Sequence, residues 1–160
     1  MKTLFPLLIA ATAFATPAAA QVMTPAEYVA TSGASDLYER QSSALVLETT
    51  RNPAVRSFAT MMVKAHQNST NDIVAAARRA RVPVTPPALT PTQAEMIAQL
   101  RAETGASRDA AYVAQQRAAH GQALAVQQAY AASGTAAPLK AVAAKVAGVV
   151  QSHIGMLMKM

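Results

Sequence analysis

The spacing of the prolines constrains this chain more than any other feature of its sequence. Beyond residue 24, long proline-free stretches alternate with single prolines and with one Pro-rich segment, residues 82–90. Proline is tolerated in the first turn of a helix but disrupts a helix interior. The proline-free stretches are rich in alanine, a strong helix former, so long helices fit there. The prolines that separate them are Pro25, Pro53, Pro83, Pro86, Pro87, Pro91 and Pro138.

Capping residues support the same helix boundaries. Thr24-Pro25-Ala26-Glu27 and Thr90-Pro91-Thr92-Gln93 are capping boxes, in which two side chains satisfy free backbone N–H groups at a helix start. Asn52 before Pro53 predicts a third helix start. The remaining predicted caps are Thr135 at a helix start, and Gly105 and Gly134 at helix ends.

These boundaries predict an all-α fold. The expected helices cover residues 25–50, 53–81, 91–104, 106–132 and 136–159. No segment shows the alternating pattern of a strand. Four long helices joined by short turns favour an antiparallel four-helix bundle, with the short helix added between the second and third long helices. The length of 160 residues fits one domain.

Each long helix also needs an apolar stripe that faces the core. The 106–132 helix offers few large apolar residues and many alanines, and alanine buries little area, so we expect modest stability. The residues expected to face inward from the last helix are Leu139, Val142, Val146, Val149, Met156 and Leu157.

The first twenty residues resemble a cleavable export signal. Met1-Lys2 gives a positive start, and residues 4–15 form an apolar run too short to span a bilayer. Ala18-Ala19-Ala20 is a small-residue cleavage site. We therefore predict cleavage after Ala20, a periplasmic location and one helical domain over residues 21–160. No later segment is apolar enough over 18 residues to predict a transmembrane helix.

Composition and motifs argue against most enzyme classes. The chain has no cysteine, which excludes disulfides, thiol nucleophiles and cysteine-based metal sites. It has no P-loop, dinucleotide-binding or G-x-S-x-G motif. The net charge is +6, but the one tight basic cluster, Arg78, Arg79 and Arg81, closes a helix where cations favour the dipole. We expect no nucleic-acid partner, and at most weak contact of this cluster with an anionic envelope surface.

Histidines occupy a similar position on three helices. His66, His120 and His153 each lie on the inward stripe of one long helix, and Glu39 lies at the corresponding place on the first. If the 106–132 helix runs toward the end where the first two helices meet, the four groups fall within about 9 Å of one another along the bundle axis, at 1.5 Å per residue. One group per helix at similar depth is the arrangement that metal sites in helical bundles use.

Two interpretations of these histidines stay open. Zinc, copper and iron all accept neutral imidazole, with a carboxylate as fourth ligand. Soft sulfur near the site, from Met62, Met156 or Met160, would favour copper(I). Alternatively, each imidazole is a buried side chain hydrogen-bonded to hydroxyl or amide groups, and a methionine on an apolar face is ordinary packing. Tyr38, Tyr112 and Gln116 are candidates for such partners.

Short runs along the whole chain resemble a known family. The runs are Tyr28-Val29-Ala30, residues 35–39, residues 52–66, residues 108–113, His120, Leu139-Lys140 and His153. In order and spacing they resemble the bacterial exported family called domain of unknown function 4142. That family is described as ferritin-like, is often labelled an outer-membrane protein, and has no established biochemical role.

The resemblance implies a ferritin-like four-helix bundle, in agreement with the proline spacing. Ferritin-like di-iron sites use Glu-x-x-His on two helices. Here the residue three before His66 is Val63, and the residue three before His153 is Val150. The carboxylates that di-iron chemistry requires are therefore missing from both positions.

Three functions follow from these observations. The leading interpretation is a non-enzymatic exported envelope protein, with a link to stress tolerance that the family resemblance implies. The alternative is a protein that binds zinc, copper or iron through His66, His120, His153 and Glu39. The third is a peripheral module that contacts envelope lipid or protein partners through an exposed apolar patch.

Overall fold

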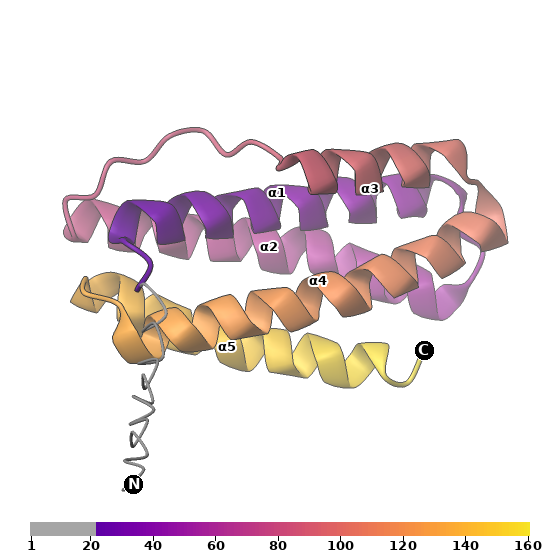
Figure 1. The fold of residues 1–160 in the computed structure, drawn as a ribbon. Helices are drawn as coiled ribbons and strands as arrows, with labels where there is room; N and C mark the ends of the chain where they lie inside the picture. Colours follow the sequence, from indigo (N-terminus) through magenta and orange to yellow (C-terminus); the bar gives the residue numbers. More distant parts are fainter. Residues whose placement is uncertain (1–21) are drawn as a thin grey trace, which may run out of the picture.

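The computed structural model describes residues 22–160, in which five α-helices are joined by loops (Figure 1). The helices are α1 (Pro25–Thr49), α2 (Pro53–Arg79), α3 (Pro91–Ala102), α4 (Gly105–Ser133) and α5 (Ala137–Leu157). The described residues contain no strand, so the all-α prediction is confirmed. The predicted export signal and cleavage after Ala20 lie outside the described residues.

The capping residues start three helices as expected. Thr24 and Thr90 each form a complete capping box at the starts of α1 and α3. The Asn52 side chain accepts hydrogen bonds from the backbone N–H groups of Ala54 and Val55 at the start of α2. These bonds satisfy N–H groups that have no partner within the helix, which fixes where each helix begins.

Two predicted caps are wrong. Gly105 does not end α3 but begins α4, with a φ of +54° that lets the chain turn directly from one helix into the next. Ala136, not Thr135, is the N-cap of α5, and it makes no side-chain capping bond. Gly134 does end α4, and a Cβ there would lie 2.6 Å from the Tyr130 ring, so the close approach requires glycine.

The four long helices surround a shared interior. α1 packs against α2 and α4, and α5 packs against α4 and α2. α1 and α2 run in opposite directions, as do α4 and α5, but α2 and α4 run in the same direction, so the order is not antiparallel throughout (Figure 1). The shorter α3, which lies between α2 and α4 in the sequence, packs over α1 and α4. Every long helix therefore contributes one face to the same core.

That core contains two separate apolar clusters. The Tyr130 cluster lies toward the start of α1, and the Phe58 cluster toward its end. The Tyr130 cluster comprises Tyr28, Val29, Ile73, Ala76, Ala77, Tyr130, Leu139, Val142, Ala143, Val146 and Val150. The Phe58 cluster comprises Val46, Val55, Phe58, Ala59, Met62, Leu100, Tyr112 and Leu157.

A band of buried polar side chains separates the two clusters. On each long helix, its members lie in sequence between residues of one cluster and residues of the other. We call this band the polar layer, and its members are Asp36, Glu39, Ser42, His66, Gln116, His120 and His153. Helix geometry thus brings polar groups from four helices to one level of the core.

The inward stripe of α5 differs from the predicted one. Val149 and Met156 are 42% and 40% exposed, whereas Val150 and His153 are buried. Six buried residues of α5 are spaced alternately four and three positions apart, and they are Leu139, Ala143, Val146, Val150, His153 and Leu157. This spacing keeps one stripe toward the core, and it turns Val149 and Met156 outward.

A buried arginine connects α3 to the other helices. The Arg108 side chain on α4 donates hydrogen bonds to the backbone carbonyls of Glu103, just after α3, and Leu45 on α1, both at 2.7 Å. It also forms an ion pair with the exposed Glu48 at 3.1 Å. Three segments of the chain therefore depend on one guanidinium.

Candidate metal centre

His66 is held in place from one side of its ring. Its Nδ1 lies 2.7 Å from Oδ1 of Asp36 on α1, and the Thr70 hydroxyl donates to the other carboxylate oxygen at 3.0 Å. Its Nε2 is buried and has no hydrogen-bond partner. A carboxylate on one imidazole nitrogen, which leaves the lone pair of the other nitrogen free, is the arrangement typical of metal-binding histidines.

His120 and His153 meet on the other side of the layer. The Nδ1 of His120 donates to the backbone carbonyl of Gln116 at 2.9 Å, which leaves its Nε2 facing His153. That Nε2 lies 3.3 Å from Nδ1 of His153. The Phe58 ring packs near both imidazoles, with centroid distances of 6.4 and 6.3 Å, and closes the site toward its own cluster.

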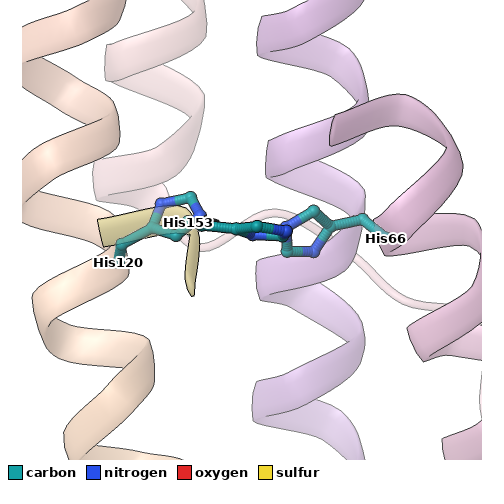
Figure 2. Close-up of side chains that lie close together, drawn as sticks. All are labelled: His66, His120 and His153. Atoms are coloured by element: carbon teal, nitrogen blue, oxygen red, sulfur yellow. Dashed lines mark hydrogen bonds between the residues drawn. The ribbon is translucent and has the colours of Figure 1, made fainter. Parts of the chain in front are cut away.

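The three imidazoles converge on a common point (Figure 2). Each offers a nitrogen, and these nitrogens all lie within 4.8 Å of one another. At bond lengths of about 2.0–2.1 Å, two nitrogens bound to one tetrahedral ion lie roughly 3.3 Å apart. The distance between His120 and His153 already equals this value. The wider separations reach it after side-chain movements on the order of 1 Å.

Glu39 lies beside this group rather than within it. Its Oε1 is 3.6 Å from Nδ1 of His120, the ring nitrogen that faces away from His153, and its Oε2 is buried without a partner. Nearby, the Gln116 side chain donates to Ser42 at 3.2 Å, while its own oxygen is also unsatisfied. Buried polar atoms without partners are rare in folded proteins, and the polar layer holds three of them.

Electrostatics set the protonation of the layer. Burial, reinforced by the charge of His66, lowers the pKa of His120 to about 3 and the pKa of His153 to about 4. Burial alone would lower the pKa of His66, but the hydrogen bond to Asp36 and the charge of Glu39 outweigh it and raise that pKa. Burial raises the pKa of Glu39 to about 7. Two of the three imidazoles are therefore neutral at pH 7, the form that binds metals.

The structure brings some predicted site residues together and leaves others outside. The three histidines meet, with Glu39 adjacent to them. Met62 is fully buried in the Phe58 cluster. Met156 and Met160 are 40% and 37% exposed, so they lie at the surface and not in the buried layer.

The hydroxyl and amide partners considered from the sequence pair elsewhere. Tyr38 donates to Gln115, and the Tyr112 hydroxyl bonds to Ser43. Gln116 reaches His120 through its backbone carbonyl and not through its side chain. The residue that sequence analysis missed is Asp36, the direct partner of His66. Its signal was present, because Asp36 precedes Glu39 by three positions and so shares its helix face.

Two features of the structure concern contact with a membrane, namely the basic cluster and the character of the helices. Arg78, Arg79 and Arg81 are all exposed where α2 ends. Among the described residues, no helix combines the length and the apolar character needed to cross a membrane. Contact of the arginines with an anionic surface stays a prediction.

Comparisons with known proteins agree with this fold. A DUF305 protein of Streptomyces coelicolor, described as secreted, has a similar structure, with a TM-score of 0.65 over 86% of this chain and 90% of that chain. The two sequences are 15% identical, so the likeness concerns the fold alone. The comparison with curated proteins finds no match. The family model described as "Domain of unknown function (DUF4142)" matches residues 10–160, nearly the whole chain, and the protein therefore belongs to the DUF4142 family.

Proposed function

We propose that this protein binds one zinc or copper ion through His66, His120 and His153. The observation that supports the proposal is the convergence of three buried imidazole nitrogens within 4.8 Å. The orientation of His66 adds to it, because Asp36 occupies one ring nitrogen while the other has no partner. A buried group of this kind costs free energy unless a ligand satisfies it.

The donor set favours zinc or copper over iron. Imidazole nitrogens suit zinc and copper, whereas di-iron sites in helical bundles require about four carboxylates. The polar layer supplies only Asp36 and Glu39, and Asp36 is already bonded to His66 and Thr70. Among these residues, Glu39 balances the charge of the ion from beside His120, and the fourth coordination position is open to water.

The proposal places this site in an exported protein with a ferritin-like four-helix bundle. The predicted signal peptide, residues 1–20, supports export to the periplasm. The description of the similar Streptomyces coelicolor protein as secreted is consistent with it. In this proposal, metal binding is the activity of the predicted non-enzymatic envelope protein. The link to stress tolerance and the contact with envelope lipid stay predictions.

Metal analysis of the purified chain tests the proposal. The chain is prepared without a histidine tag, and bound zinc, copper and iron are measured by mass spectrometry before and after titration with each metal. We expect one zinc or copper ion per chain, and its loss in His66→Ala and His153→Ala. Gln67→Ala and Gln151→Ala are matched controls, because they remove exposed polar side chains next to those histidines on the same helices.

The Glu39→Gln variant tests whether Glu39 binds the ion directly or only balances its charge from nearby. We expect this variant to keep one ion per chain with reduced affinity, since the three imidazoles are unchanged. Complete loss of binding would make Glu39 a direct ligand. A parent chain that binds no metal, and shows no rise in unfolding temperature on adding zinc or copper, would refute the proposed function.

A further inference from the structure

A cavity of about 230 Å³ lies beneath the Pro-rich segment between α2 and α3. We call residues 82–90 of this segment the strap, and its residues 84–88 form one wall of the cavity. The other walls come from α1 and α2. We propose that this cavity is the port through which a metal ion reaches and leaves the three imidazoles, an inference that rests on the proposed function.

The floor of the cavity leads directly to the metal centre. Asp36 and Thr70 line it, and they are the two residues that hold the Nδ1 side of His66. The other nitrogen of the same ring is the buried Nε2, which has no partner. The Asp36 carboxylate and the His66 imidazole behind it therefore lie between the cavity and the point where the three histidines meet.

The chemistry of the cavity fits a small cation. Asp36 is the only charged residue among those that line it, and the remaining lining is mainly apolar. A carboxylate at the base of an apolar pocket attracts cations and disfavours anions. Because Nδ1 of His66 faces this carboxylate and Nε2 faces the other histidines, passage of the ion requires the His66 ring to turn.

Two other cavities do not reach an imidazole. A groove of about 510 Å³ between α1, α3 and α4 ends on Ser32, Tyr38 and Gln127, whose hydrogen bonds go to one another or to Tyr28 and Gln115. A larger cavity of about 1190 Å³ lies where α1 meets α2, and the Phe58 cluster separates it from the histidines. Of these three cavities, the one beneath the strap touches Asp36, the direct partner of His66, and the other two touch no hydrogen-bond partner of a histidine.

The strap is a stiff cover over this port. Pro86 and Pro87 restrict its backbone, and a Cβ added to Gly33 on α1 would lie 3.2 Å from Cβ of Pro87. The strap therefore rests directly on α1 at the edge of the cavity, and in this proposal it shifts as an ion passes. Exchange of the ion is then limited by strap movement and not by affinity.

Exchange kinetics test the port. The zinc-loaded chain is mixed with excess chromophoric chelator, and the release rate is measured by stopped flow beside the equilibrium Kd. We expect the double substitution Pro86→Gly and Pro87→Gly to speed release by about tenfold with little change in Kd, since freeing two prolines eases the movement of the strap. Pro83→Gly is the matched control, because Pro83 lies in the strap but does not line the cavity.

A blocked cavity gives the opposite result. Ala30→Phe adds a ring to the cavity wall and is expected to slow both uptake and release, whereas Ala26→Phe, one turn earlier on α1 and outside the cavity, is not. Unchanged rates in the strap variants and in Ala30→Phe, with normal zinc binding, would overturn the port and leave the proposed function intact.

A metal-free measurement keeps the two proposals distinguishable. Deuterium exchange at the C2 carbon of histidine reports access of solvent to each ring in the apoprotein. We expect the Pro86→Gly, Pro87→Gly variant to speed exchange at His66 and to leave His153 unchanged. If the chain binds no zinc, the proposed function fails by itself, and equal exchange at His66 in parent and variant would separately overturn the port.

Discussion

The two apolar clusters and the polar layer between them are built on the same four long helices, with Leu100 of α3 added to the Phe58 cluster, but in opposite ways. In the Tyr130 and Phe58 clusters, burial of apolar side chains stabilises the folded protein. In the polar layer, burial raises the pKa of Glu39 and leaves polar atoms of Glu39, His66 and Gln116 without partners. The difference teaches that stability resides at the two ends of the core, and that the middle of the core, where we propose the metal site, is maintained at a cost in stability.

The largest expected effect separates stability from binding. Leu139 is fully buried in the Tyr130 cluster, so Leu139→Ala should lower the free energy of unfolding by about 2–5 kcal/mol. It should leave zinc stoichiometry unchanged, because Leu139 lies in the Tyr130 cluster and not in the polar layer. Val149→Ala on the same helix removes an exposed side chain and should cost less than about 0.5 kcal/mol. Denaturant unfolding measures the stability of both variants, and metal analysis measures their zinc content. Loss of zinc in Leu139→Ala would show that the apolar clusters and the polar layer are not independent.

The second effect concerns the cost of the polar layer in the metal-free chain. The pKa of Glu39 rises from 4.5 to about 7 on folding, so between these pH values the folded state holds more protons and stability falls as pH rises. Glu39→Gln cannot titrate. Its stability relative to the parent should therefore increase from about pH 4.5 to pH 7 and then level off, at no more than about 3 kcal/mol.

Unfolding in denaturant at several pH values measures this difference. Glu95→Gln on α3 is the control, because Glu95 is exposed and the substitution is chemically identical. A stability difference for Glu39→Gln that stays constant across the pH range would show that the buried carboxyl does not impose the cost inferred for this layer.

The third effect tests whether Asp36 orients His66. Asp36→Asn removes the carboxylate that holds the ring, and zinc affinity should fall by about 10–100-fold. Asp72→Asn removes an exposed carboxylate that pairs with Lys145 at 2.7 Å, and it should leave affinity unchanged. Competition with a chelator of known affinity gives both Kd values. Equal Kd values for parent and Asp36→Asn would show that His66 needs no such support.

The smallest effect compares two stacked rings within one apolar cluster. Tyr28 and Tyr130 stack with centroids 4.0 Å apart, but only Tyr28 has a hydroxyl partner, Gln127 at 2.7 Å. Tyr28→Phe should cost about 0.5–1.5 kcal/mol, whereas Tyr130→Phe should be neutral or slightly stabilising. Unfolding free energies measure both, and a larger loss for Tyr130→Phe would contradict the assignment of its hydroxyl as unsatisfied.

Local signals account for most of what could be predicted about the fold. Prolines and capping boxes act within a few residues, so the starts at Thr24, Asn52 and Thr90 were correct. Gly105 was misassigned because the same residue serves both a helix end and a sharp turn into the next helix. The choice between Val149 and Val150 depended on the rotation of α5 against its neighbours, which the sequence of one helix does not specify.

Helical periodicity predicts which site residues face the core, but it does not predict their partners on other helices. The three histidines lie on inward stripes, and they do meet. Asp36, Gln116 and Gln127 are polar residues that the usual pattern assigns to the surface, yet all three are buried. Their burial follows from hydrogen bonds between different helices, which become visible only when the helices are packed together.

Arg108 has a consequence for the motions available to the short helix. If α3 swung away as a lid, the carbonyl of Glu103 would move with it, and a buried guanidinium would lose a hydrogen bond in a dry environment. Ile97 and Leu100 would also be exposed to water. α3 should therefore open only when the whole domain melts, and its slowest amide hydrogens should exchange with the same free energy as those of the long helices.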